Sequence, residues 1–175
     1  KEQHDVRFYE EYIKDRLPAK IVDAHTHLNL PEHVTNISEA AIKGDWALEC
    51  GLIMTDEDSV QYYDTLFPDK SVDNVIFPWP LVDADIKGNN KYISRLIAGK
   101  NKLGLMTIRP EWHADYIESV YIKGGFSGFK PYPYFASSVK GAEVSIFDFM
   151  PKEHFELADK LNASVLMHLP RSGRL

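Results

Sequence analysis

Apolar positions along this chain fall into short runs that alternate with stretches of helical periodicity. Five runs are typical of buried strands, at 20–28, 74–79, 103–109, 126–130 and 164–168. Apolar residues spaced three and four apart predict helices at 5–17, 91–98 and 111–122, and a further helix that starts at Pro151. Strands that alternate with helices predict βαβ units and a parallel sheet, and nearly continuous apolar strands indicate that both faces of the sheet are covered.

The segment 29–73 interrupts this alternation because it carries no strand pattern. Ser38 is placed to cap a helix, and Thr55 with Asp58 three residues later predicts a second helix start. The acidic residues there meet the positive end of the helix dipole, which favours a cap over a cation site. A long excursion between strands is uncommon and often functional, so we expect helices that cover the site.

The most informative polar residues lie in the first strand, where Asp23, His25 and His27 alternate with other residues. Side chains alternate along a strand, which predicts these three on one face with the imidazoles about 7 Å apart. A slight bend would bring both to one metal ion. A polar strand end is the alternative, but burying an unpartnered imidazole costs free energy. Asp23 either orients a metal ligand or accepts backbone hydrogen bonds.

Function in parallel α/β folds collects at the carboxyl ends of the strands. The residues predicted to stand there are His25, His27, Trp79, Arg109, Lys130 and His168. Three of these six are histidines, and they come from two strands that are far apart in the sequence. This coincidence is the strongest functional signal in the pattern.

Size and charge narrow the class of protein. The chain has 175 residues, enough for one well-buried core, and we expect a single domain over 1–175. A net charge of -6 without a Lys/Arg cluster argues against a nucleic-acid partner. No apolar run reaches membrane-spanning length and the first residues are charged, so we expect a soluble, cytoplasmic protein without a membrane partner.

The other histidines and the single cysteine carry little functional signal. His4, His33, His113 and His154 are expected to be solvated rather than metal ligands. Cys50 has no second cysteine to pair with and is expected to be a small core residue in a reducing compartment.

The motifs together resemble the amidohydrolase superfamily, and within it the amidohydrolase 2-like branch of metal-dependent hydrolases and decarboxylases. The resemblance rests on Ile-Val-Asp-Ala-His-Thr-His-Leu at 21–28, on Gly-Phe-Lys-Pro at 128–131, on Leu-Met-His at 166–168 and on the tyrosine-bearing helix before the first strand. It spans nearly the whole chain. It implies a (β/α)8 TIM barrel in which His25 and His27 from the first strand and His168 from the fifth hold one divalent ion, zinc or else manganese, iron or cobalt.

The family also uses an aspartate after the eighth strand to accept a proton from the metal-bound water. Such a barrel ordinarily takes about 250 residues, whereas the fifth strand ends near residue 168 here. We therefore expect 1–175 to represent about the first five β/α units of an incomplete barrel domain. We also expect this piece to be inactive without the aspartate.

The resemblance implies a metal-dependent hydrolase that acts on a small carboxylate, lactone, amide or ester. Arg109, Lys130 and Arg171 are candidate anchors for an anionic small-molecule substrate. In the family, a lysine in the position of Lys130 is carboxylated and bridges two ions, binds substrate, or only packs. Alternatives are a non-oxidative decarboxylase, a noncatalytic barrel-derived binding protein, and a phosphoesterase with several metal ions. The sequence is compatible with a homo-oligomer.

Overall fold

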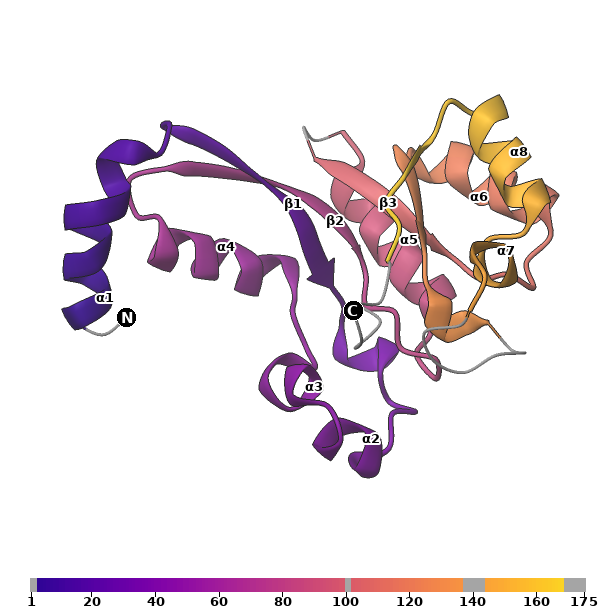
Figure 1. Cartoon of the computed structure of the whole chain (residues 1–175), viewed down its shortest axis with the longest axis horizontal. Helices are drawn as coiled ribbons and strands as arrows, with labels where there is room; N and C mark the ends of the chain where they lie inside the picture. The colour runs from indigo at the N-terminus through magenta and orange to yellow at the C-terminus, as the bar shows by residue number, and fades with distance from the viewer. Residues whose placement is uncertain (1–2, 100–101, 137–143, 169–175) are drawn as a thin grey trace.

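The computed structural model describes residues 3–99, 102–136 and 144–168. Its centre is a sheet of five parallel strands in the order β1-β2-β3-β4-β5 (Figure 1). The strands are β1 (Lys20–Leu28), β2 (Ser71–Pro78), β3 (Leu103–Ile108), β4 (Gly128–Pro131) and β5 (Ser164–Val165). The predicted α/β class, with a parallel sheet, is confirmed.

Helices connect each strand to the next. Between β1 and β2 lie α2 (Glu39–Lys43), α3 (Trp46–Gly51) and α4 (Asp56–Leu66), and the later connections hold α5 (Ile86–Ile97), α6 (Ala114–Gly124), α7 (Ile146–Phe149) and α8 (Lys152–Lys160). Before β1, α1 (Gln3–Phe8) continues through a π-helical turn (Tyr9–Ile13) and a 3-10 turn (Lys14–Arg16). Short 3-10 turns also follow β1 (Pro31–His33) and β4 (Pro133–Phe135). The four-residue α7 was not predicted, although Ser145 caps it.

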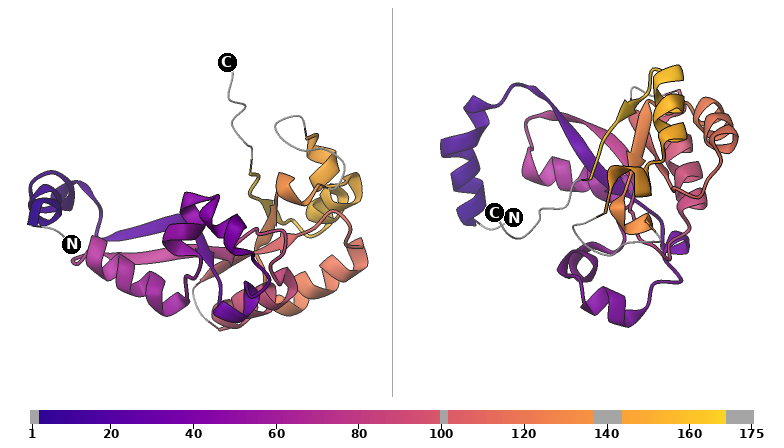
Figure 2. Two further views of the ribbon diagram at one scale, coloured as in Figure 1. Left: turned by 90° about the horizontal axis from the view of Figure 1, so that it is seen from below. Right: turned by 45° about the vertical axis from the view of Figure 1, so that its right-hand side comes forward.

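One face of the sheet packs against helices. The core there joins strand residues to α5, α6 and α8, and its fully buried members include Ile76, Met106, Phe129, Ile93 and Ile117. Figure 2 shows α4, α5 and α6 following one side of the curved sheet. In β3, Met106 and Ile108 point into this core, and the residues that alternate with them point to the opposite face of the sheet.

We expected both faces of the sheet to be covered, but part of the opposite face is open. Along its amino-terminal half, an open groove of about 250 Å³ is lined by strand and loop residues alone. Its apolar walls include Val75, Leu103, Leu105 and Leu166. Near the carboxyl ends of the strands, the same face carries Phe77 and Lys130, which are both fully buried.

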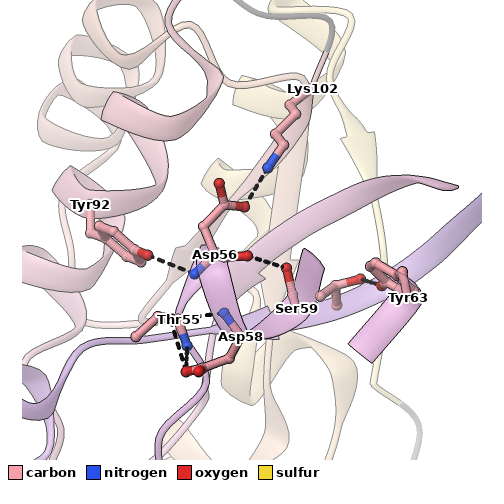
Figure 3. Close-up of polar contacts among 8 residues, drawn as sticks. Thr55, Asp56, Asp58, Ser59, Tyr63, Tyr92 and Lys102 are labelled. Atoms are coloured by element: carbon pink, nitrogen blue, oxygen red, sulfur yellow. Dashed lines mark hydrogen bonds and ion pairs between the residues drawn. The ribbon is translucent and has the colours of Figure 1, made fainter. Parts of the chain in front are cut away.

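The start of α4 shows how the long 29–73 segment is ordered. The Thr55 hydroxyl accepts a hydrogen bond from the amide of Asp58, and the Asp58 carboxylate accepts one from the amide of Thr55 (Figure 3). The amide of Asp56 donates to the hydroxyl of Tyr92 on α5, and the Asp56 carboxylate pairs with Lys102. The predicted cap is confirmed, and Ser38 likewise caps α2. α2 and α3 lie beyond the carboxyl end of β1, whereas α4 runs beside β1 and β2 (Figure 1).

We expect Thr55→Ala to lower the free energy of unfolding by about 1 kcal/mol, because it removes the side chain that caps α4. Urea denaturation followed by circular dichroism measures the change. The matched control is Thr35→Ala, which alters an exposed loop threonine and should shift the midpoint very little. Equal midpoints for the two variants would contradict the capping role.

Two expectations about individual side chains are wrong. Cys50 is exposed, because α3 is short and Leu48 is its only buried side chain. His33 and His154 are buried rather than solvated. The Nδ1 atom of His33 accepts a hydrogen bond from the amide of Leu30, and the Nε2–H of His154 donates to the carbonyl of Trp112 at 2.8 Å. His4 and His113 are exposed as predicted.

The helix predicted over 5–17 forms and packs at one end of the molecule (Figure 1). Tyr9 is its buried residue: the ring packs edge-on against Phe67 and the hydroxyl donates to Asp69. Among the described residues, none of the helices has both the length and the apolar character needed to span a bilayer.

Candidate functional site

His25 and His27 meet at the carboxyl end of β1. Their Nε2 atoms lie 3.2 Å apart and their ring centroids 5.1 Å apart. Two nitrogens that each lie 2.0–2.1 Å from one tetrahedral zinc ion would be about 3.3 Å apart. The two imidazoles therefore already have the spacing of two ligands on one ion.

A β-bulge produces this arrangement. Asp23 pairs with Asn74 and Thr26 pairs with Ile76, so that Ala24 and His25 together lie opposite the single residue Val75. An extra residue shifts the alternation of side chains beyond it. His25 in the bulge and His27 beyond it both pack their rings against Phe77 of β2, with centroids 5.0 and 4.8 Å from the Phe77 ring.

The predicted common face for Asp23, His25 and His27 is therefore wrong for Asp23. Its carboxylate accepts a hydrogen bond from the hydroxyl of Tyr63 on α4 at 2.8 Å, and Thr26 Oγ1 donates to the same hydroxyl. The other Asp23 oxygen accepts from the backbone amide of His25 at 2.9 Å. Of the two roles left open for Asp23, the structure shows the backbone-accepting one, and this contact holds the bulge in place.

His27 is held in one tautomer. Its Nδ1–H donates to the carbonyl of Pro78 at 3.1 Å, so that the lone pair of the neutral ring lies on Nε2, facing His25. Burial lowers the pKa of His27 to about 4, and the nearby charges of His25, Lys130 and His168 act in the same direction. A neutral imidazole whose second nitrogen is bonded to a carbonyl is a well-prepared metal ligand.

Lys130 lies at the centre of the same face. Its side chain is fully buried, and its Nζ atom lies 4.7 Å from the ring centroid of Tyr132 and 5.3 Å from that of Phe77. Burial lowers its pKa from 10.5 to about 8. Within the described part of the chain, none of the ion pairs includes Lys130.

His168 stands just after β5 and next to the aromatic run that follows Lys130. Its ring centroid is 5.5 Å from those of both Tyr132 and Tyr134. Burial lowers its pKa first, and the charges of Lys130 and His25 lower it further. The fold thus brings His25 and His27 of β1, Lys130 of β4 and His168 after β5 close enough for their charges to affect one another's pKa.

Of the other residues predicted at the strand ends, Trp79 contacts the histidine pair and Arg109 does not. The ring of Trp79 packs 5.2 Å from that of His27. Arg109 pairs with Glu111 at 2.6 Å, donates to the carbonyl of Val82, and stacks over Phe135. The structure therefore gives Arg109 local partners rather than a contact with the histidines. Arg171 lies outside the described residues.

Two buried hydroxyls were not foreseen from the sequence. Neither Thr107 Oγ1 nor Tyr132 Oη has a hydrogen-bond partner among the described residues, and both side chains are nearly inaccessible to solvent. Thr107 is the neighbour of Lys130 in the β3–β4 pairing. Burial raises the pKa of Tyr132, so its hydroxyl stays protonated and able to donate. The position of Tyr132 two residues after Lys130 was the available signal for that hydroxyl.

No family model, curated protein or solved structure matches this chain. Within residues 3–99, 102–136 and 144–168, no three His, Cys, Asp or Glu side chains converge closely enough to hold an ion as they stand.

Proposed function

We propose that this chain contains the metal-binding part of a metal-dependent hydrolase of the amidohydrolase type. The observation that carries the proposal is the His25–His27 pair, with Nε2 atoms 3.2 Å apart at the carboxyl end of β1. The bond from His27 Nδ1 to Pro78 supports it, because it leaves Nε2 free to coordinate.

The donor set suits one zinc ion, and manganese, iron or cobalt are alternatives. His25 and His27 would supply two ligands, and His168, whose ring packs against Tyr132 and Tyr134, would supply the third. Burial and neighbouring charges lower the pKa of all three histidines, so the rings are neutral at pH 7. When bound, such an ion supplies a Lewis acid and a water whose pKa is about 7.

The sheet topology supports a barrel as the parent fold. Strands in sequential order, with connecting helices on one face, are the arrangement expected of a sector of a (β/α)8 barrel, whereas a doubly wound sheet has helices on both faces. On this proposal the open groove at Val75 and Leu105 faces the barrel interior. The proton-accepting aspartate of the family would come from a strand outside the five described.

The chain's own residues favour a small anionic substrate. The Lys130 ammonium group is charged below a pH of about 8 and would bind a carboxylate of the substrate. The unpartnered hydroxyls of Thr107 and Tyr132 can each donate a hydrogen bond to a substrate oxygen. The aromatic rings of Phe77 and Tyr132 pack against the Lys130 ammonium group. Arg109 is the weaker anchor, because Glu111 already neutralises it.

Metal analysis of the intact protein tests the proposal. We expect about one divalent ion per chain, with anomalous scattering locating it beside His25 and His27. Removing the ion with a chelator should abolish hydrolysis of a panel of small lactones, esters and amides of carboxylic acids, and adding zinc should restore it. Release of carbon dioxide without water incorporation would indicate the decarboxylase instead. An ion-free protein that cannot be loaded would contradict the metal site.

A further inference from the structure

A second cavity lies on the other side of the sheet, between α5 and α6. It has a volume of about 300 Å³, at the lower end of the range for small-molecule sites. Its lining comes from both helices and the turn that follows α6: Lys87, Asn90, Lys91, Ser94, Tyr116, Val120, Lys123, Gly124 and Phe126. We call it the α5–α6 groove. It shares no residue with the histidine site.

The charge of the α5–α6 groove is its most unusual property. Lys87, Lys91 and Lys123 all line it, and within the described ranges none of the three forms an ion pair with a carboxylate. Lys87 and Lys91 are one helical turn apart, where like charges repel. All three side chains are exposed along the open groove, and three cations without ion-pair partners on a protein with net charge -6 create a local positive potential that attracts anions.

One carboxylate, that of Asp85, lies near these lysines, but within the described residues it forms no ion pair with them. Asp85 is close enough for its charge to raise the pKa of Tyr116, after the larger effect of burial. However, one Asp85 oxygen is engaged in capping α5, where it accepts a hydrogen bond from the amide of Gly88 at 2.9 Å. The lysines therefore keep their capacity to donate to a ligand.

The walls of the groove offer an apolar surface beside the cations. Lys87 Nζ lies 4.8 Å from the ring centroid of Tyr116 and 5.7 Å from that of Trp112, which holds the ammonium group over the aromatic wall. Val120 and Phe126 supply the rest of this wall. Gly124 allows the close packing, because a Cβ atom there would lie 2.5 Å from the Phe126 ring.

From these features we infer that the α5–α6 groove binds a small organic phosphate, with the phosphate at the lysines and an apolar or aromatic part against Tyr116, Val120 and Phe126. Lysine ammonium groups bind phosphate as point charges, and a phosphate dianion carries twice the charge of a carboxylate to set against three cations. No arginine is among the described residues that line the groove, so these lysines are its cationic groups. This site is independent of the proposed hydrolase function, since the sheet separates the two.

Phenyl phosphate, inorganic phosphate and phenol are suitable probes, used with the full protein in chelator and in a phosphate-free buffer. We expect phenyl phosphate to bind, with amide chemical shifts changing along α5 and α6, and to bind more weakly as salt is added. Inorganic phosphate should bind at least about threefold more weakly, because it lacks the ring contact, and phenol should not bind. Calorimetry gives the affinities.

Charge-removing variants locate the site. Lys91→Gln and Lys123→Gln should each weaken phenyl phosphate binding about threefold to tenfold. Lys43→Gln and Lys152→Gln remove the same charge from exposed positions on α2 and α8, and they should leave binding unchanged. Equal losses for groove and control variants, or shift changes confined to the histidine face, would overturn the inference. Equal affinity for inorganic phosphate and phenyl phosphate would contradict the inferred contact between the groove and an apolar part of the ligand.

Discussion

We expect the His27→Ala variant of the intact protein to bind zinc more than about 100-fold more weakly than the wild type and to lose its hydrolytic activity. Removing a partner of a metal ligand already costs 10–100-fold in affinity, and this variant removes a ligand itself. The Nε2 atoms of His27 and His25 lie 3.2 Å apart, so the variant leaves His25 as the one remaining histidine ligand on β1. Competition with a chromophoric chelator measures the affinity.

A histidine outside the site provides the control. His113 is exposed at the start of α6, and its side chain makes no capping hydrogen bond. His113→Ala should therefore retain the zinc affinity of the wild type. His25→Ala and His168→Ala should weaken binding as His27→Ala does. If all three of these variants kept full zinc affinity, the three-histidine set would be wrong.

The strands and helices could be predicted from the sequence because the hydrophobic pattern of each element lies within a short segment of the chain. Apolar runs at 74–79 and 103–109, with helical stripes between them, reflect burial that recurs at the period of each element. Within the helix predicted over 91–98, Ile93 and Ile97 are buried, four residues apart on one face of α5. The helix ends just before Gly99, which has a positive φ of 66°.

The bulge at Ala24 and His25 could not be predicted in the same way. Its defining feature is that these two residues face one residue of β2, and this pairing is absent from the sequence of β1. The error on Asp23 followed directly, since a shift of one residue exchanges the faces of a strand. The histidine pair remained predictable, because the step from His25 to His27 follows the extra residue and keeps these two side chains on one face.

Burial of individual side chains also depends on partners from distant segments. Lys130 is enclosed by Phe77 from β2 and by Tyr132, which the pattern around residue 130 does not show. Cys50 was misplaced for the opposite reason, because a six-residue helix with one buried side chain has no periodic pattern to read. The three lysines of the α5–α6 groove come together only when the two helices pack.

The buried lysine leads to the second large effect: Lys130→Met should raise the stability of the protein while it abolishes binding of anionic substrates. The pKa of Lys130 falls from 10.5 to about 8 because burial disfavours the charged form. A shift of that size corresponds to roughly 3 kcal/mol of unfavourable free energy in the folded state at pH 7, which is an upper bound for the gain. Methionine keeps most of the side-chain volume without the charge.

The pH dependence identifies the cause of this gain. Below a pH of about 8 the lysine is protonated in both the folded and the unfolded chain, so the cost of burying its charge is fully present. Between about 8 and 10.5 the folded form has lost its proton and the unfolded form still binds it, so wild-type stability rises relative to Lys130→Met. Urea denaturation of the metal-free protein at pH 7 and pH 10 should therefore show a stabilisation that shrinks as the pH rises. Lys102→Met is the contrasting control: it removes the partner of Asp56 and should destabilise the protein by about 1 kcal/mol. A pH-independent gain for Lys130→Met would mean that packing, rather than relief of a buried charge, stabilises the variant.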